Sequence, residues 1–385
     1  MSFSSVAWAA DAEVNLTSLR PLSPATEMAQ GIKSYTQTPR TLRVGVFVYN
    51  LLNMRKFAIT LILFLGVAFV YLSFGELESI LRTLQQGNFW FILIAILVQF
   101  AWFLVAGLIF RSLYHVLGME DTLYKLSLLA ASANFINTVA PSAGVGGVAV
   151  FISNARRNRQ SVGKVTVASM LYLFLDYLAF LVVLALGLIV LFRRNDLGPA
   201  QLAASSVMLA IAAGLGSLLY LGSRSADALG NALAKMARLV NRVVDPFIHR
   251  DYLSEARAHE FAHEMASDLK SLPEKVHNLS LPLLYSFASK ALLMGVLLSV
   301  FMAFQVPFSA GTIIGGFAIS YLFLIVSPTP SGVGIVEGIM PLALSSLRVP
   351  WSEAVIITLA YRGITFWLPL GFGALALRML EREKK

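Results

Sequence analysis

Four ionisable residues lie well inside strongly apolar segments of this sequence, namely Asp176, Lys290, Glu337 and Arg362. Each would cost about 2.5 to 3.5 kcal/mol at the centre of a membrane helix on insertion scales, so each should face the protein interior and be paired. We therefore expect two ion pairs, Glu337 with Arg362 and Asp176 with Lys290. Such pairs could contact or gate a polar ligand, or they could be structural pairs that bind nothing.

Two breaks rich in proline and glycine interrupt apolar stretches near residues 126–155 and 311–346. The first reads Pro-Ser-Ala-Gly-Val-Gly-Gly from position 141, and the second reads Pro-Thr-Pro-Ser-Gly-Val-Gly from position 328. Each stretch is long for one membrane span and short for two, since a helix needs about 20 residues to cross about 30 Å of hydrocarbon. We expect each stretch to form a re-entrant hairpin of two half-helices that meet near the midplane.

Broken backbone at membrane depth predicts a cavity, because lipid cannot satisfy free N–H and C=O groups. A half-helix that begins after either break would direct N–H groups and the positive end of its dipole into this cavity, which favours a phosphate or a carboxylate. Ser142 and Ser331 could add hydroxyl donors. The alternative is that the glycines only permit close helix packing, as in the spacing of Gly334 and Gly338.

The predicted binding residues combine both breaks with the four buried charges. The substrate-binding set is Asn137, Ser142, Gly144, Gly146, Gly147, Asp176, Lys290, Ser331, Gly332, Gly334, Glu337 and Arg362. Arg156 and Arg157 follow the first break, and we expect them to touch anionic lipid headgroups at the membrane surface.

A different chemistry is suggested by His259, Glu260 and His263, which match the H-E-x-x-H pattern. On one face of a helix, two such histidines can bind zinc while the glutamate acts as general base. No third ligand follows at a recognisable spacing, although Glu274 and His277 are candidates. A membrane zinc protease is therefore an alternative, but we expect a solvated helix here and predict no metal, no cofactor and no catalytic residue.

The composition assigns these residues to a membrane protein. Hydrophobic residues make up 57% of the 385 residues and charged residues only 13%, with a mean hydropathy of +0.73, whereas a soluble domain has about 25% charged residues. The chain has no cysteine, which excludes disulfides, Cys-ligated zinc and iron–sulfur clusters. Its formal net charge of +9 fits lysine and arginine in cytoplasmic loops, so we expect no nucleic-acid partner.

We expect an all-α, polytopic membrane helical bundle with six spans and two re-entrant half-helix hairpins. The apolar runs long enough to span lie near 57–75, 89–110, 165–192, 201–222, 281–304 and 354–377. We predict three domains. Residues 1–54 form a flexible cytoplasmic N-terminal arm. Residues 55–200 form a first membrane half that contains hairpin 126–155, and residues 201–385 form a second membrane half that contains hairpin 311–346.

The second half also contains a predicted cytoplasmic loop, 223–280. Within this loop, apolar residues such as Leu229, Leu233 and Met236 recur on one face of a helix, with lysine and arginine elsewhere. Such an amphipathic helix either lies in the cytoplasmic interface of the membrane or packs on the ends of the spans.

The distribution of lysine and arginine orients the bundle. With both interrupted stretches as hairpins and the N-terminus inside, the inside segments hold 24 Lys and Arg and the outside segments hold 4. If both stretches crossed fully, each side would hold 14, against the positive-inside rule. We therefore expect hairpins, cytoplasmic termini and two halves in inverted-repeat arrangement. Interrupted segments at corresponding positions of inverted repeats are typical of a transporter binding site.

The two breaks also resemble those of a known family. The run Asn137–Gly147, followed by an Arg-Arg pair and a span that carries Asp176, resembles the flippase-like family of the lysylphosphatidylglycerol synthase transmembrane region. The runs Pro330–Glu337 and Tyr361–Pro369 are similar to the second motif and the final arginine-bearing span of that family. The likeness covers about residues 50–380.

This resemblance implies two re-entrant elements and movement of phosphate-bearing lipids between leaflets. It also implies that Glu337 and Arg362 are the family's acidic residue after the second glycine motif and its last-span arginine. Two departures from the family's pattern, Ser331 in the second motif and Val148 after the first, leave the headgroup open. The chain ends at Lys385 without a soluble synthase domain, so we do not expect it to make lysylphosphatidylglycerol.

The function we expect is that of a lipid flippase for an anionic or zwitterionic phosphate-bearing lipid. Its partners would be an anionic phospholipid or a polyprenyl-phosphate lipid, with a homodimer or a lipid-modifying enzyme as protein partners to test. The expected location is the cell (inner) membrane, with multiple passes. Besides the zinc protease, the sequence leaves open an accessory subunit of a lipid-modifying or glycosyl-transfer enzyme.

Overall fold

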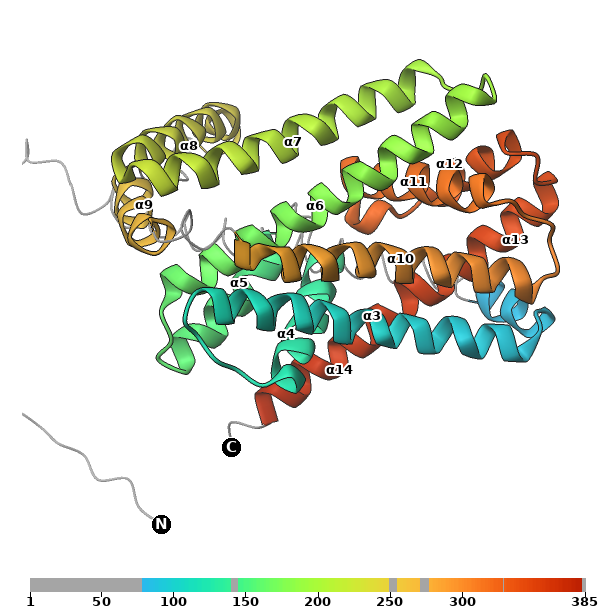
Figure 1. Cartoon of the computed structure of the whole chain (residues 1–385), viewed down its shortest axis with the longest axis horizontal. Helices are drawn as coiled ribbons and strands as arrows, with labels where there is room; N and C mark the ends of the chain where they lie inside the picture. Colours follow the sequence, from blue (N-terminus) through green and yellow to red (C-terminus); the bar gives the residue numbers. More distant parts are fainter. Residues whose placement is uncertain (1–77, 140–144, 249–254, 271–276, 328, 383–385) are drawn as a thin grey trace, which may run out of the picture. The chain divides into compact units, whose positions relative to one another are not determined.

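The computed structural model describes residues 78–139, 145–248, 255–270, 277–327 and 329–382. The predicted N-terminal arm, 1–54, and the first predicted span, 57–75, lie outside these residues. The described residues form helices and connecting turns without strands, which confirms an all-α membrane bundle (Figure 1). The helices are α3 (Phe89–Val116), α4 (Leu123–Val139), α5 (Val145–Arg157), α6 (Val162–Arg193), α7 (Pro199–Arg224), α8 (Ala226–Ile248), α9 (Glu255–Leu269), α10 (Ser280–Ala303), α11 (Ala310–Val326), α12 (Ile335–Ser346), α13 (Trp351–Arg362) and α14 (Leu368–Arg382).

Five helices in the described part of the chain are long and apolar enough to cross a membrane. They are α3, α6, α7, α10 and the run from α13 to α14, and they match five of the six predicted spans. The Asn88 side chain accepts a hydrogen bond from the Trp90 N–H at the start of α3, and the Ser161 side chain accepts one from the Lys164 N–H at the start of α6. Behind these caps, α3 and α6 contain no proline and continue for 28 and 32 residues.

The two interrupted stretches each form a pair of short helices. α4 packs against α5, and α11 packs against α12. These four helices have 12 to 17 residues each, fewer than the roughly 20 residues that cross a bilayer. Each interrupted stretch is therefore divided into two helices and is not one continuous span.

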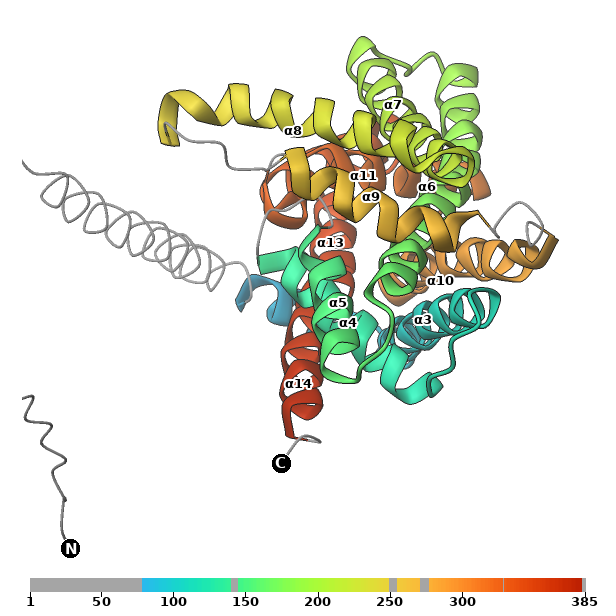
Figure 2. The same ribbon diagram turned by 90° about the vertical axis from the view of Figure 1, so that its left-hand side faces the viewer.

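Each short pair packs against the last span of the other predicted half. α4 contacts α14, and α11 contacts α6. α3 and α10, the second span of each half, lie side by side (Figures 1 and 2). The two predicted halves therefore pack against each other through their second spans and through their short helices.

The segment predicted as a cytoplasmic loop is largely helical. α8 and α9 pack against each other, and α9 packs against α6 and α7. On the apolar face of α8, Leu229 is buried and Leu233 is half-buried, whereas Met236 is 51% exposed. The first part of this face thus packs on the spans, and the exposed part suits the membrane interface.

The contact between α9 and α6 brings a carboxyl group against backbone. A Cβ built at Gly163, near the start of α6, would lie 2.8 Å from Asp268 Oδ2 on α9. Burial raises the pKa of the Asp268 carboxyl above its ordinary value of 3.8, and the positive charge of Lys164 partly opposes this rise. The packing of α9 therefore includes a carboxyl group whose pKa is raised by burial.

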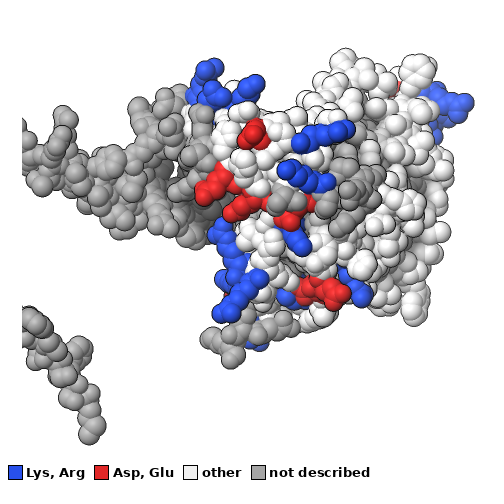
Figure 3. All heavy atoms as spheres, turned by 60° about the vertical axis from the view of Figure 1, so that its left-hand side comes forward, with Lys and Arg blue, Asp and Glu red and all other residues white. Residues whose placement is uncertain are grey.

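The surface of the membrane unit separates apolar from charged side chains. Leu97 and Leu104 on α3 are 59% and 53% exposed, and Leu209 on α7 is 58% exposed. Such exposed apolar groups on long spans fit contact with lipid. Charged side chains gather at the end where α8 and α9 lie (Figure 3).

Candidate functional site

The second break joins α11 to α12 through a short 3-10 turn, Pro330–Gly332. Three residues adopt left-handed backbone conformations here, with φ of 47° at Ser331, 71° at Gly332 and 80° at Gly334. Glycine adopts such angles at no steric cost, so the Gly-x-Gly sequence permits the sharp turn. At Gly332 a side chain would also lie 3.2 Å from Leu324 Cα.

Glu337 and Arg362 form the first predicted ion pair, so this pairing is confirmed. Arg362 Nε donates to Glu337 Oε1 at 2.5 Å, and the Gly334 N–H donates to Glu337 Oε2 at 2.8 Å. Arg362 Nη2 also donates to the Ser331 carbonyl at 3.2 Å, and the guanidinium lies 4.5 Å from the centre of the Phe366 ring. Arg362 is 2% exposed, and its contacts fix the turn of the second break.

The last span is not a regular α-helix. α13 ends at Arg362, the residues Gly363–Trp367 form a π-helical turn, and α14 begins at Leu368. Single π turns inside α-helices are rare and occur frequently at functional sites. Gly363 allows a close approach here, since a Cβ would lie 2.5 Å from Ile80 Cγ2. Apolar patterning predicts an uninterrupted span, so the π turn was missed.

The first break is fixed by Asn137 near the end of α4. Asn137 Oδ1 accepts a hydrogen bond from the Gly147 N–H of α5 at 2.7 Å. A Cβ at Gly147 would lie 2.5 Å from Asn137 Nδ2, so only glycine permits this approach. Gly146 precedes it near the start of α5, whereas Ser142 and Gly144 lie outside the described residues.

The second break contacts the end of α4, which precedes the first break in the sequence. Ser331 Oγ donates to Thr138 Oγ1 at 3.2 Å, and Thr138 Oγ1 donates to the Asn134 carbonyl at 2.8 Å. The alternative role for the glycines, close packing at Gly334 and Gly338, has no partner among the described residues. A Cβ at either would meet no described atom beyond its own helix within 4 Å.

Asp176 and Lys290 form the second predicted ion pair, which is also confirmed. Lys290 Nζ lies 2.7 Å from Asp176 Oδ1 and donates to Asp176 Oδ2 at 2.8 Å and to the Tyr321 hydroxyl at 2.7 Å. The ammonium group also lies 4.3 Å from the centre of the Tyr321 ring. Because Lys290 is 1% exposed, these protein groups compensate its charge in place of water.

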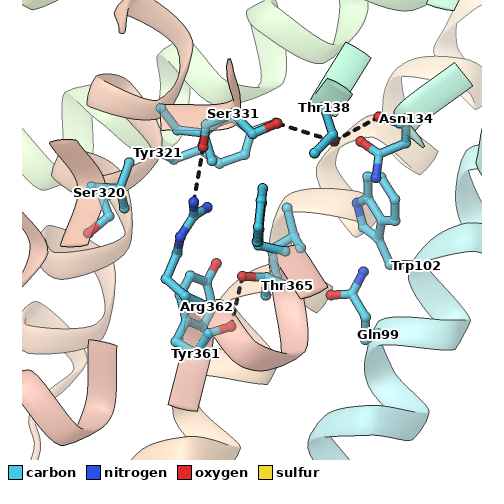
Figure 4. A pocket seen from close by; sticks show the side chains of 14 residues that line it. Gln99, Trp102, Asn134, Thr138, Ser320, Tyr321, Ser331, Tyr361, Arg362 and Thr365 are labelled. Carbon is cyan, nitrogen blue, oxygen red and sulfur yellow. Dashed lines mark hydrogen bonds between the residues drawn. The ribbon is translucent and has the colours of Figure 1, made fainter. Parts of the chain in front are cut away.

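A cavity of about 110 Å³, here called the arginine cavity, lies between the second break and the π turn (Figure 4). Its lining includes Arg362, Gln99 and Trp102 of α3, and Asn134 and Thr138 of α4. Other residues come from α10, α11 and α12, so both predicted halves contribute to it. Its polar lining groups are hydroxyls, amides and one guanidinium.

A second cavity of about 140 Å³, the aspartate cavity, adjoins the first. Trp102, Asn134 and Tyr321 line both cavities, and Asp176 and Asn137 line the second. Each ion pair therefore contributes one residue to a cavity wall. The structure thus brings the predicted charges and the two breaks together around two adjoining hollows.

Several lining residues were missed by sequence reasoning, namely Gln99, Trp102, Asn134 and Tyr321. For Gln99 a signal existed, because an amide in the middle of an apolar span is costly unless it faces a polar interior. The same signal existed for Asn134, an amide in the apolar stretch of α4, whereas Trp102 and Tyr321 carry no such signal. They gather only because α3, α4 and α11 pack around one point.

Other predicted residues lie away from the cavities. Arg156 and Arg157 are exposed at the end of α5 and line neither cavity. In the H-E-x-x-H segment of α9, His263 Nε2 lies 3.3 Å from Asp227 Oδ1, and both side chains are exposed. No group of three or more His, Asp or Glu that could hold a metal occurs among the described residues, and the candidate ligand Glu274 lies outside them.

The comparison with protein families returns one match for the chain. The family described as the lysylphosphatidylglycerol synthase TM region matches residues 54–373. This range includes both breaks, both ion pairs and the two cavities. A search of curated proteins found no match to the chain.

Proposed function

Since the chain belongs to the lysylphosphatidylglycerol synthase transmembrane family and is a multi-pass membrane protein, we propose that it moves phosphate-bearing lipids between the two leaflets. The observation that carries this proposal is the buried guanidinium of Arg362 in a polar cavity where both breaks meet. A guanidinium binds phosphate through paired N–H donors of fixed geometry. The site therefore suits the phosphate of a lipid headgroup.

Arg362 retains donors for such a phosphate. Its Nε donates to Glu337 and its Nη2 donates to the Ser331 carbonyl. These two bonds use two of the five N–H donors of a guanidinium. The remaining donors can bind phosphate oxygens while Glu337 keeps the side chain in place.

The cavities are large enough for part of a headgroup and too small for acyl chains. Their volumes are about 110 and 140 Å³, whereas one water takes about 30 Å³ in the liquid. The acyl chains would therefore stay in the bilayer while the headgroup crosses through the protein. Rocking of the two halves about the Asp176–Lys290 pair, which joins them, would open the cavities to each leaflet in turn.

The proposed topology places the short helix pairs as re-entrant hairpins from opposite faces of the membrane. The protein would lie in the inner membrane of the cell. The end that carries α8 and α9 would face the cytoplasm, and both termini would lie on the same side. This orientation rests on the excess of lysine and arginine in the segments assigned to that side.

The test is transport by the purified full chain in liposomes that contain fluorescent anionic phospholipid. We expect Arg362→Ala to slow transport roughly 10- to 100-fold, since a hydrogen bond to a charged group contributes about 1.5 to 3 kcal/mol. Arg382→Ala, at the exposed end of α14, is the matched control and should transport normally. Wild-type rates equal to those of protein-free liposomes for every anionic lipid, or undiminished rates in Arg362→Ala, would refute the proposal.

A further inference from the structure

Gln99 is a buried amide without a partner on one of its atoms. It is 1% exposed, and its Oε1 has no hydrogen-bond partner among the described residues. The side chain lines the arginine cavity, and its amide points toward the side where Thr365 and Arg362 lie (Figure 4). Buried polar atoms are almost always hydrogen-bonded, so an acceptor of this kind indicates a ligand that donates.

Two of the hydroxyl groups that line the cavity already donate their protons to the protein. Ser320 Oγ donates to the Gly316 carbonyl, and Thr365 Oγ1 donates to the Tyr361 carbonyl. Each hydroxyl has one proton, so only its lone pairs remain available. The cavity thus combines one strong cationic donor, Arg362, with several neutral acceptors.

The cavity offers no negative charge to a cationic headgroup. Glu337 and Asp176, the carboxylates of the two pairs, are each bound to a buried cation. The faces of Phe366 and Tyr321 are also occupied, since Arg362 and Lys290 lie over them at 4.5 and 4.3 Å. An ammonium group would lose its hydration here without a compensating charge, next to a guanidinium.

We propose that this cavity selects phosphopolyol headgroups, which carry a phosphate and neutral hydroxyls, over headgroups that carry an ammonium group. Gln99 is the specificity-determining residue, because its Oε1 accepts a hydrogen bond from a headgroup hydroxyl. The inference rests on the proposed function, since it takes Arg362 as the phosphate site. It adds the headgroup class and the residue that reads it.

Binding can be measured without transport. Isothermal titration of the purified full chain in detergent would compare dihexanoyl phosphatidylglycerol with dihexanoyl phosphatidylethanolamine. We expect phosphatidylglycerol to bind roughly tenfold more tightly, and Gln99→Leu to lose roughly that factor for phosphatidylglycerol alone, since leaving one buried polar partner unmet has an effect of this order. Asn154→Leu is the control, because Asn154 is a buried amide that lines neither cavity, and it should bind like wild type.

A charge variant and a free headgroup sharpen the test. Gln99→Glu places a carboxylate in the cavity and should reverse the preference toward phosphatidylethanolamine. sn-Glycerol 1-phosphate, which has no acyl chains, should bind more weakly than phosphatidylglycerol. If it binds more tightly, the site takes the free phosphopolyol and the lipid assignment is overturned. Equal affinities for the two lipids, or an unchanged preference in Gln99→Leu and Gln99→Glu, would overturn the headgroup assignment even if liposome transport succeeds. Normal selectivity in binding without transport would instead count against the flippase function alone.

Discussion

Lys290 contacts one carboxylate, one hydroxyl and one aromatic ring in the protein interior. Removal of its charge should therefore lower the free energy of unfolding by a predictable amount. Lys290→Met keeps the apolar stem and removes the ammonium group that lies 2.7 Å from Asp176 Oδ1. The Asp176 carboxylate, 8% exposed, would then lack its cation. Breaking a buried ion pair by removing one partner costs about 3 to 5 kcal/mol. Asp176→Asn should cost a similar amount, because it leaves the buried ammonium unpaired.

The double variant Asp176→Asn/Lys290→Met separates pairing from other contacts. Replacing both members of a buried pair with neutral groups is often close to neutral, so the double variant should regain most of the lost stability. Two single losses of about 3 to 5 kcal/mol each and a nearly neutral double variant give an expected coupling energy of about 5 kcal/mol or more. The exposed pair of Arg82 and Glu78, which lie four residues apart at 2.6 Å, provides a control cycle with an expected coupling of about 1 kcal/mol or less.

Thermal unfolding of the purified chain in detergent measures these differences. Domains of similar size shift by about 2 to 4 °C per kcal/mol, so each single variant should unfold roughly 10 °C below wild type. The double variant should unfold within a few degrees of wild type. Single losses that simply add in the double variant would mean that Asp176 and Lys290 do not act as a unit, and the reasoning on paired buried charges would be refuted.

Three further outcomes follow from the same structure. Gly147→Ala should destabilise the chain by about 1 to 3 kcal/mol, because its Cβ would clash with Asn137. Gly214→Ala, whose Cβ would meet nothing within 4 Å, should leave stability unchanged. Equal unfolding temperatures of the two variants would contradict this. Burial raises the pKa of Asp268 in the folded protein, so wild-type stability should fall as pH rises from 3.8 through that raised pKa. Asp268→Asn should remove this dependence of stability on pH. Parallel stability profiles of the two proteins against pH would refute the prediction. In this cysteine-free chain, a membrane-impermeant maleimide applied to intact cells should label Arg348→Cys and not Arg156→Cys, and the reverse pattern would invert the proposed topology.

Hydropathy along the chain is enough to predict the bundle, because a span needs only a sufficient apolar run. Five of the predicted spans match helices of the described residues. Both ion pairs were also predictable, since few charges enter the apolar segments and each needs an opposite partner. Two acids and two bases allow two pairings, and the structure has the predicted one, Asp176 with Lys290 and Glu337 with Arg362.

Irregular backbone was less predictable than the pairs. The π turn after Arg362 follows from close packing of Gly363 on Ile80, a contact between segments far apart in the chain. The left-handed backbone of Ser331 is likewise tied to a hydrogen bond from Arg362 to its carbonyl. No local pattern of residue types encodes such contacts.

Local hydropathy and the cost of buried charge are enough to predict the class of protein, the breaks in two short helix pairs and the four charges that need partners. The tertiary structure alone decided that Gln99, Trp102 and Tyr321 share a cavity wall with Arg362. These residues come from three separate helices, α3, α11 and α13. Their convergence depends on helix packing angles and side-chain volumes across both halves, which the order of residues along one helix does not specify.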